Sequence, residues 1–203
     1  MVQFYKPNKK VTGTACSFWM NRDQTFMASM IKQDGWNDKT GTGSFAKNKD
    51  NPNKRVVVKL GNEEVAGIIN VLETNTEWST YHRSPKQELQ IKFCPYLRDG
   101  KQIGYSFSVS KQDSGDSTNR VGFIIGFSYP EGRYLKEYLL FLLQGWFKLD
   151  EAKQLERIRE DRKKMKVVEP SGGKGVGQDL DVDPEEEVKS SGTPSRENED
   201  FEW

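Results

Sequence analysis

The sequence predicts an α+β protein built from two successive units, each consisting of antiparallel β-strands followed by a helix. Segments with strand-type alternation precede each of two helix-type segments. Short residue matches between the two halves recur at nearly constant spacing. The 203 residues are enough for one medium-sized domain with a real core. We therefore expect one domain over residues 1–148, made of two repeats at about 10–75 and 76–148.

The strands of the first unit begin with a hairpin over residues 14–33, whose two β-type segments flank the turn-prone Asn21–Asp23. A stretch rich in Gly, Asn, Asp and Lys follows and contains a candidate short strand at 42–46. The run of β-branched residues in 54–60 predicts a further strand.

The strands of the second unit repeat this pattern. Residues 88–96 alternate like a strand, and the Arg98–Gly100 turn leads into the strict alternation of 103–110. Residues 120–128 predict the last strand. Phe107 of the preceding strand and Phe123 and Phe127 of this one lie on apolar faces that are expected to point to the core.

Each unit ends in a predicted helix. Apolar residues recur at i, i+3, i+4 and i+7 in residues 62–74, and Asn62 is a candidate N-cap. The second helix is predicted over about 130–147, with Ser128 and Glu131 spaced as in a capping box.

Matching residues support a duplication of the strands-then-helix unit. Three matches lie 78, 76 and 79 residues apart, which argues for an internal repeat. They are Cys16-Ser17-Phe18 with Cys94-Pro95-Tyr96, Arg22-Asp23 with Arg98-Asp99, and Lys32-Gln33-Asp34 with Lys111-Gln112-Asp113.

Charge divides the chain into a basic body and an acidic tail. Residues 169–203 contain 11 acidic and 3 basic residues, which leaves 19 acidic and 28 basic residues in 1–168. The charged residues 149–168 are expected to form a helical extension exposed to solvent. A narrow row of apolar residues along it allows a homo-oligomer contact as the alternative. The Gly-, Ser-, Pro- and acid-rich residues 169–203 are expected to be disordered.

Catalytic and metal-binding motifs are poorly represented, so we expect no enzyme activity, cofactor or metal. His82 is the sole histidine, and Gly172–Gly177 follows no strand and opens no helix, as a phosphate loop would. Cys16 and Cys94 are expected to be reduced thiols. The first ten residues lack the apolar run of a signal peptide, and we expect a cytoplasmic protein with no membrane partner.

Binding of a single-stranded nucleic acid fits the residue types better. Bases stack on aromatic rings and phosphates pair with Lys or Arg, and the predicted strands interleave these two kinds of residue. The candidate binding residues are Trp19, Lys32, Trp36, Lys39, Phe45, Lys47, Lys54, Arg55, Trp78, Tyr81, Arg83, Lys92, Lys111 and Arg120.

The end of the chain is a second candidate site. Glu199, Asp200, Phe201, Glu202 and Trp203 form an aromatic tip between acids. This tip resembles those of the replicative single-stranded-DNA-binding proteins of bacteria and phages. The resemblance implies a tail that recruits replication or recombination proteins and covers the DNA groove when DNA is absent.

The layout of about 10–147 resembles the Whirly family, and also a fused pair of the single repeat of the transcriptional positive-coactivator fold. The residues that carry it are KRVVVKL followed by NEEVAGIINVL, and RVGFIIGFS followed by PEGRYLKEYLLFLL. With the tail, the resemblance is to a phage or bacterial type, acting in DNA replication, recombination or repair. It implies single-stranded DNA held without sequence specificity. An RNA-binding or annealing protein and a protein-interaction scaffold are the alternatives.

Overall fold

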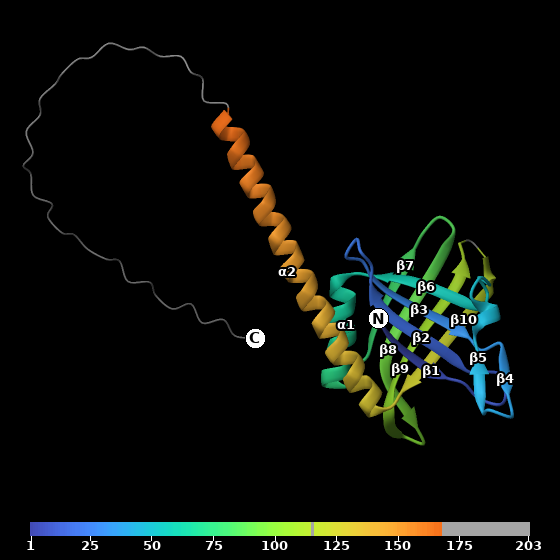
Figure 1. The fold of residues 1–203 in the computed structure, drawn as a ribbon. Helices are drawn as coiled ribbons and strands as arrows, with labels where there is room; N and C mark the ends of the chain where they lie inside the picture. The colour runs from blue at the N-terminus through green and yellow to red at the C-terminus, as the bar shows by residue number, and fades with distance from the viewer. Residues whose placement is uncertain (115, 168–203) are drawn as a thin grey trace, which may run out of the picture. The chain divides into compact units, whose positions relative to one another are not determined.

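The computed structural model describes residues 1–114 and 116–167 (Figure 1), and the side chains of 115–118 and from 165 onward are not described. Residues 1–160 form one compact unit and 161–203 a second. The acidic tail predicted over 169–203, with its aromatic tip, lies outside the described residues.

Two four-stranded antiparallel sheets form the body of the protein. The first sheet has the order β1-β2-β3-β6, and the second has the order β10-β9-β8-β7. The first comprises β1 (Val2–Lys6), β2 (Thr14–Met20), β3 (Phe26–Lys32) and β6 (Arg55–Leu60), and the second comprises β7 (Trp78–Arg83), β8 (Gln87–Arg98), β9 (Lys101–Asp113) and β10 (Asp116–Phe127). The helix α1 (Asn62–Thr74) follows the first sheet, and α2 (Tyr129–Val167) follows the second.

The duplication predicted from the sequence is present in this architecture. Each half runs through four strands and then a helix, and the matching residues occupy equivalent points. Cys16 lies on the second strand of its sheet, as Cys94 does, and Arg22 and Arg98 lie at the equivalent hairpin turns. The two halves differ in one insertion: residues 33–54 separate β3 from β6, whereas only two residues separate β9 from β10.

The first strand of each half is absent from the sequence prediction. β1 is only five residues long and ends just before Pro7, and the expected start near residue 10 was therefore too late. β7 faces inward with Trp78, Thr80 and His82, which do not read as an apolar stripe. Both strands are fixed by pairing with the strand that follows them, β1 with β2 and β7 with β8.

Aromatic side chains join the two sheets in a common core. The ring centroids of Phe4 and Phe127 lie 4.9 Å apart, with the rings edge to face, and those of Phe18 and Phe107 lie 5.4 Å apart. The expected core residues Phe107, Phe123 and Phe127 are all buried. Figure 1 shows the strands of one sheet running across those of the other.

The helices pack beside one another and against the sheets. A Cβ added to Gly67 of α1 would lie 2.4 Å from the Trp78 indole nitrogen, so helix and strand are in close contact there. Lys136 of α2 forms a 3.0 Å ion pair with Glu73 of α1. The N-cap of α1 is Gly61 and not the expected Asn62, since Gly61 has extended dihedral angles and Asn62 is already helical. The expected second helix and charged extension form one continuous helix.

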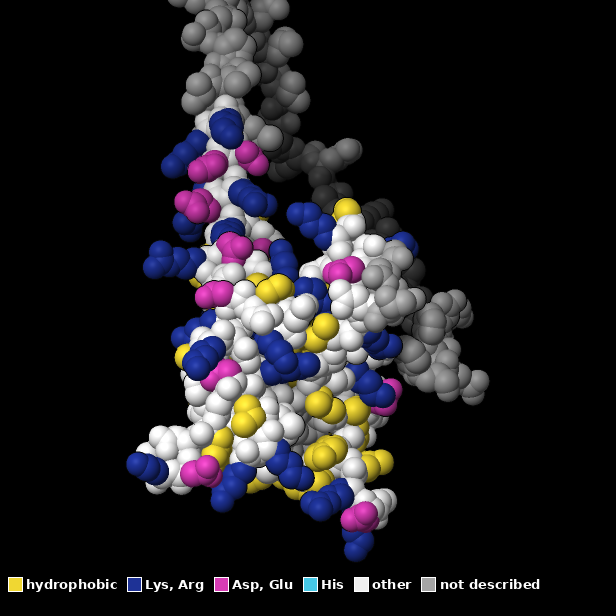
Figure 2. All heavy atoms as spheres, turned by 90° about the vertical axis from the view of Figure 1, so that its right-hand side faces the viewer, with side chains coloured by type: hydrophobic (Ala, Val, Ile, Leu, Met, Phe, Trp, Pro, Cys, Tyr) yellow, Lys and Arg dark blue, Asp and Glu magenta, His cyan; other side chains and the backbone are white. Residues whose placement is uncertain are grey.

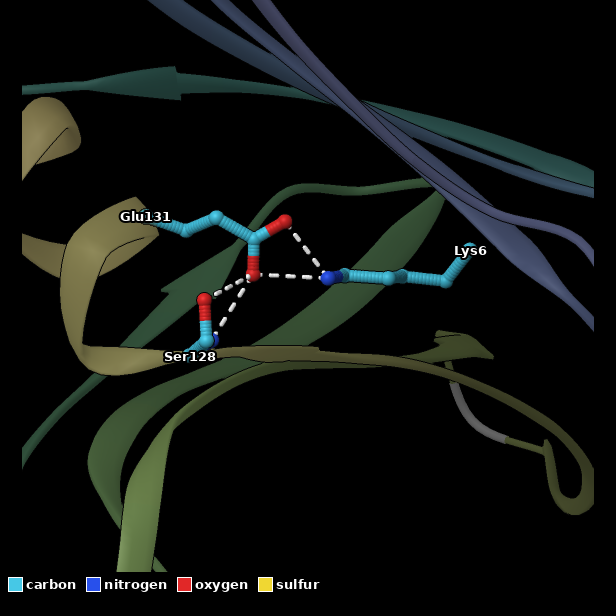
Figure 3. A network of polar contacts seen from close by, with 3 residues as sticks. All are labelled: Lys6, Ser128 and Glu131. Carbon is cyan, nitrogen blue, oxygen red and sulfur yellow. Dashed lines mark hydrogen bonds and ion pairs between the residues drawn. The ribbon is translucent and has the colours of Figure 1, made fainter.

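Two side-chain contacts join the first strand of each half to the helix of the other half, an ion pair in one case and a histidine–carboxylate hydrogen bond in the other. Lys6 of β1 contacts both carboxylate oxygens of Glu131 at 2.5 and 2.6 Å, and Glu131 also accepts hydrogen bonds from the backbone N–H and hydroxyl of Ser128 (Figure 3). His82 Nε2 of β7 lies 2.6 Å from Glu64 Oε1 of α1. Glu64 and Glu131 are both at the third position of their helices. The same strand-to-helix contact, called a brace below, therefore occurs twice and links each half to the other.

These contacts control the charge of both carboxyl groups. Burial acts to raise the pKa of the Glu131 carboxyl, but the Lys6 ammonium and the Ser128 donors outweigh it and hold this pKa below its usual value. The pKa of the Glu64 carboxyl is also lowered. Burial acts to raise it, but the hydrogen bonds with His82 and the Gly61 N–H outweigh this effect.

Candidate nucleic-acid interface

The outer face of the first sheet has small side chains at its centre and large ones around them. Cross-strand pairing places Ala15 between Tyr5 and Ile31, and Ser17 between Gln3 and Ser29. Trp19, on the same face, is paired with Met27. Because the central side chains are small, the middle of this face is hollow.

A groove of about 550 Å³ occupies this hollow. Tyr5, Trp19 and Phe45 are three of the residues that line it, and Ser17 and Ser29 lie on its floor. The ring centroids of Tyr5 and Phe45 are 5.9 Å apart, with an angle of 58° between the ring planes. Tyr5 is 55% exposed, and Trp19 and Phe45 are half-buried. The groove therefore presents three aromatic rings to solvent.

The 33–54 insertion contributes one side of the groove. It contains β4 (Gly35–Asn37), β5 (Thr42–Ser44) and the short 3₁₀ helix η1 (Ala46–Asn48). Asn48 Nδ2 donates a 2.8 Å hydrogen bond to the carbonyl of Lys32, which ties η1 to the end of β3. Phe45 lies immediately before η1, so this anchor also positions its ring beside Tyr5.

Basic residues lie at the insertion end of the groove. Arg55 and Lys49 both line it, and Arg55 Nη1 donates a 3.0 Å hydrogen bond to the carbonyl oxygen of Lys49. Within residues 1–114 and 116–167 neither side chain pairs with a carboxylate. Their charge is thus available to an anionic ligand.

Figure 2 shows one side of the molecule, on which β4, β5 and β10 lie. Lys and Arg side chains surround exposed hydrophobic ones on this side, and acidic side chains are fewer than basic ones (Figure 2). This mixture suits a ligand with flat apolar rings and negative phosphates.

The outer face of the second sheet differs in chemistry. Its pocket, of about 220 Å³, is lined mainly by polar side chains, including Tyr81, Glu88 and Arg120. Hydrogen bonding to Glu88 raises the pKa of the Tyr81 hydroxyl. Arg83 pairs with Glu88 at 3.3 Å. The Glu88 carboxylate offsets the basic residues of this face and would repel a phosphate.

The sequence candidates therefore fall into several places. Trp19, Phe45 and Arg55 come together in the groove. Trp36 and Lys39 belong to the β4–β5 hairpin region, and Lys47 is an exposed residue of η1.

The remaining candidates lie elsewhere. Trp78 is half-buried and packs against α1 and the core, away from the groove. Lys92 pairs with Glu77 at 2.7 Å on the outer face of the second sheet, where Tyr81, Arg83 and Arg120 also lie. Lys32 and Lys54 line a separate cleft, and Lys111 lies late on β9, paired across the sheet with Leu89 and Val121.

Of the aromatic and basic residues that line the groove, Tyr5 and Lys49 are not among the sequence candidates. Tyr5 lies on the short strand β1 that the sequence did not reveal. The match between Phe4-Tyr5 of β1 and Thr80-Tyr81 of β7, each an inward residue followed by an outward tyrosine, is a signal that could have found it. Lys49 lies in a lysine-rich stretch with nothing local to distinguish it.

Within the described part of the chain, no group of three or more His, Cys, Asp or Glu side chains is arranged to hold a metal ion. No helix there is long and apolar enough to span a bilayer. Cys16 and Cys94 are both free thiols, and burial raises the pKa of Cys16 far above its usual value.

Comparisons with known proteins give a likeness of fold. No family model and no curated protein sequence matches the chain. The crystal structure of WHY1 from Arabidopsis thaliana aligns with 77% of this chain and 92% of its own, at 14% identity and a TM-score of 0.51. The plant transcriptional regulator PBF-2 aligns with 74% of this chain and 85% of its own, at 16% identity and a TM-score of 0.50. The Trypanosoma brucei MRP1/MRP2 structure aligns more weakly, with a TM-score of 0.47. The chain has a Whirly-like fold, as expected from the layout of its sequence.

Proposed function

We propose that this chain binds single-stranded nucleic acid, DNA in the first place, with bases stacked in the groove on the first sheet. The observation that carries this proposal is the combination of Tyr5, Trp19 and Phe45 in one open groove, with Arg55 and Lys49 at its end. A base offers a flat face to any of these rings regardless of its identity, and the phosphates between bases favour the cations. Binding through stacking tolerates any sequence.

The fold gives this proposal weaker, independent support. PBF-2, a plant transcriptional regulator, shares the Whirly-like fold, and regulators of transcription act at nucleic acids. Folds host many functions, so the fold alone would not identify a ligand. The residues of the groove carry the argument.

The cellular role belongs to the same proposal. A sequence-independent binder of single strands would coat DNA during replication, recombination or repair, in the cytoplasm of a bacterium or a phage-infected cell. The protein acts without catalysis, and the tip Glu199–Trp203 recruits a protein partner. The acidic residues of 169–203 compete with DNA for the basic body, since they carry a net charge of opposite sign.

A titration tests the binding proposal directly. The full-length protein is mixed with oligothymidine of about 30 nucleotides, long enough for several binding sites of the usual size. We expect tight binding that weakens as salt rises, weak binding to the matched duplex, and quenching of tryptophan fluorescence that Trp19→Ala reduces and Trp78→Ala does not. A parallel titration with oligouridine separates DNA from RNA. Absence of binding to any single strand would reject the proposal and favour a protein-interaction scaffold.

Removal of the tail tests the competition. Deletion of 169–203 takes away 11 acidic and 3 basic residues, so the truncated protein should bind oligothymidine more tightly at low salt. The two proteins should converge at high salt, where screening weakens the attraction between tail and body. Equal affinities at low salt would mean that the tail does not compete with DNA.

A further inference from the structure

A second cleft, of about 360 Å³, lies on the other side of the first sheet from the groove. Lys32 at the end of β3 and Lys54 just before β6 line it. Phe123 and Ile124 of β10 line it as well, and β10 is an edge strand of the second sheet. The cleft therefore lies where the end of one sheet meets the edge of the other.

Two ammonium groups share this cleft, and neither has a carboxylate partner in residues 1–114 and 116–164. Lys32 Nζ lies 5.0 Å from the centroid of the Phe123 ring, a cation–π contact that holds the ammonium at the cleft. Neither Lys32 nor Lys54 takes part in an ion pair within the described residues. Partial burial and the charge of Lys54 together lower the pKa of Lys32. An anion placed between the two groups would offset their mutual repulsion.

One wall of the cleft is held in a strained conformation. Val11 lies at its rim with φ of 56°, a left-handed value that costs a β-branched residue about 1–2 kcal/mol. Asn8 holds this turn, because its carbonyl accepts a hydrogen bond from the Val11 N–H and its side chain accepts one from the Thr12 N–H. Strain that the surroundings maintain in this way is often found at ligand sites.

A buried glutamine fixes the same wall from behind. Gln33 is 5% exposed, and its Oε1 accepts hydrogen bonds from the N–H groups of Asn8 and Gly13 at 2.9 and 3.2 Å. Its Nε2 donates to the carbonyls of Asn8 and Gly35 at 3.0 and 2.7 Å. The turn that contains Val11 is thus tied to the end of β3, and the cleft is formed before any ligand enters.

The cleft also has an apolar part. Ile124 is 61% exposed and Val11 is 39% exposed, although both are hydrophobic. A lone phosphate would need the two lysines but would gain nothing from these side chains. A nucleotide would use both, since its phosphate is anionic and its base has apolar faces.

We propose that this cleft binds one nucleotide of a nucleic-acid strand, with a phosphate between Lys32 and Lys54 and the base against Val11 and Ile124. This inference rests on the proposed function and adds a second point of contact to it. Lys32 and Lys54 are the direct sequence neighbours of the groove residues Ile31 and Arg55. The two sites therefore flank the same end of the first sheet, on opposite faces.

The salt dependence of binding tests this assignment, because each phosphate contact adds about 0.7 to the slope of log affinity against log salt for a single strand. The double variant Lys32→Gln/Lys54→Gln should reduce the slope for the 30-nucleotide oligothymidine by about 0.7, because both lysines contact the same phosphate. The control variant Lys86→Gln/Lys101→Gln removes the same charge from exposed lysines without ion pairs in the described residues, and should change the slope by less than half as much.

Two further variants keep the test decisive. Lys54 is exposed, so Lys54→Gln alone does not disturb the core, and it should lower the slope by part of the change seen in the double variant. Ile124→Asp should weaken binding of the same oligonucleotide with no effect on the Trp19 quenching amplitude at saturation. Free inorganic pyrophosphate should compete with the oligonucleotide less well than a mononucleotide at the same concentration, since pyrophosphate lacks a base.

The outcomes separate the cleft from the groove. If the lysine variants match the control while Trp19→Ala still weakens binding, the cleft is rejected and the groove stands. If pyrophosphate competes as well as a nucleotide, the site is a plain anion site and the nucleotide assignment is overturned. If the unaltered protein binds no single strand, both proposals fail.

Discussion

Two tyrosines at equivalent places in the duplicated fold offer a direct test of which sheet binds bases. Tyr5 of β1 and Tyr81 of β7 both point outward and are 55% and 56% exposed. Tyr5 faces Phe45 across the groove, whereas the Tyr81 hydroxyl is hydrogen-bonded to Glu88 on a polar face. The perturbation is to replace each tyrosine by alanine, Tyr5→Ala in one protein and Tyr81→Ala in the other.

The geometry sets the size of the expected effect. A base held between two rings needs about 7 Å between them, because each stacked layer requires about 3.5 Å. The Tyr5 and Phe45 centroids are only 5.9 Å apart and the rings are tilted by 58°, so a base can stack on one ring but not between the two. Loss of one stacking contact corresponds to the lower part of the usual range, about 1–2 kcal/mol. Tyr5→Ala should therefore weaken binding by about 5- to 30-fold.

Fluorescence anisotropy of a labelled oligothymidine measures both affinities under the same salt conditions. Tyr81→Ala should bind within about twofold of the unaltered protein, since it removes no base contact in our scheme. Neither change removes a core contact, and equal urea midpoints for the three proteins would confirm that folding is unaffected. Equal loss of affinity in the two variants, or loss in Tyr81→Ala alone, would refute the assignment of binding to the first sheet.

Two further predictions concern stability. Gly67→Ala should lower the free energy of unfolding by about 1 kcal/mol, because the added Cβ clashes with the Trp78 ring and this overpacking exceeds the gain in helix propensity. The control Gly145→Ala adds a Cβ that meets nothing within 4 Å, so it should raise the free energy of unfolding by about 0.5–1 kcal/mol. Urea unfolding measures both changes. Equal gains in stability at the two positions would show that the Trp78 indole moves aside freely. The lowered pKa of Glu131 means that its pair with Lys6 stabilises the fold above the unfolded carboxyl value of about 4.3 and is lost as pH falls through the lower folded value. Glu131→Gln should thus be less stable than the unaltered protein at pH 7, and the gap should narrow at pH 3; a constant gap would count against the brace.

Local patterns in the sequence were sufficient for much of the fold. The β-branched run before Leu60 and the helical spacing from Val65 predicted β6 and α1, and α1 has the expected bounds. The hairpin of β2 and β3 followed from its turn residues. These elements are set by propensity and periodicity, which act over a few residues.

Elements that depend on distant partners were not predictable in this way. β1 is a short edge strand whose pairing with β2 determines its register. The N-cap at Gly61 was misassigned by one position, because Asn is a stronger N-cap residue than Gly and the local preference therefore favoured Asn62. Such assignments need the tertiary contacts that only the folded chain supplies.

The candidate site shows the same division. Trp19, Phe45 and Arg55 could be selected by residue type, and the fold brings them together. Nothing local separates Arg55 from Lys92, although Lys92 is paired with Glu77 and Arg55 has no carboxylate partner among the described residues. Ion pairing between strands depends on register, which a list of basic residues does not contain.

The two halves of the molecule therefore share a scaffold and differ in surface chemistry. Duplication alone would give two equivalent outer faces, because the strand order and the reciprocal braces are the same in both halves. The insertion at 33–54 changes this balance, since it adds Phe45 and Lys49 beside Tyr5 on one face only. Carboxylates such as Glu88 act in the opposite direction on the other face. Replacing residues 34–53 with a link as short as the one between β9 and β10 removes Phe45 and Lys49 from the groove. The affinities of the Tyr5→Ala and Tyr81→Ala variants should then no longer differ. A difference that persists would place the binding determinant in the strands themselves.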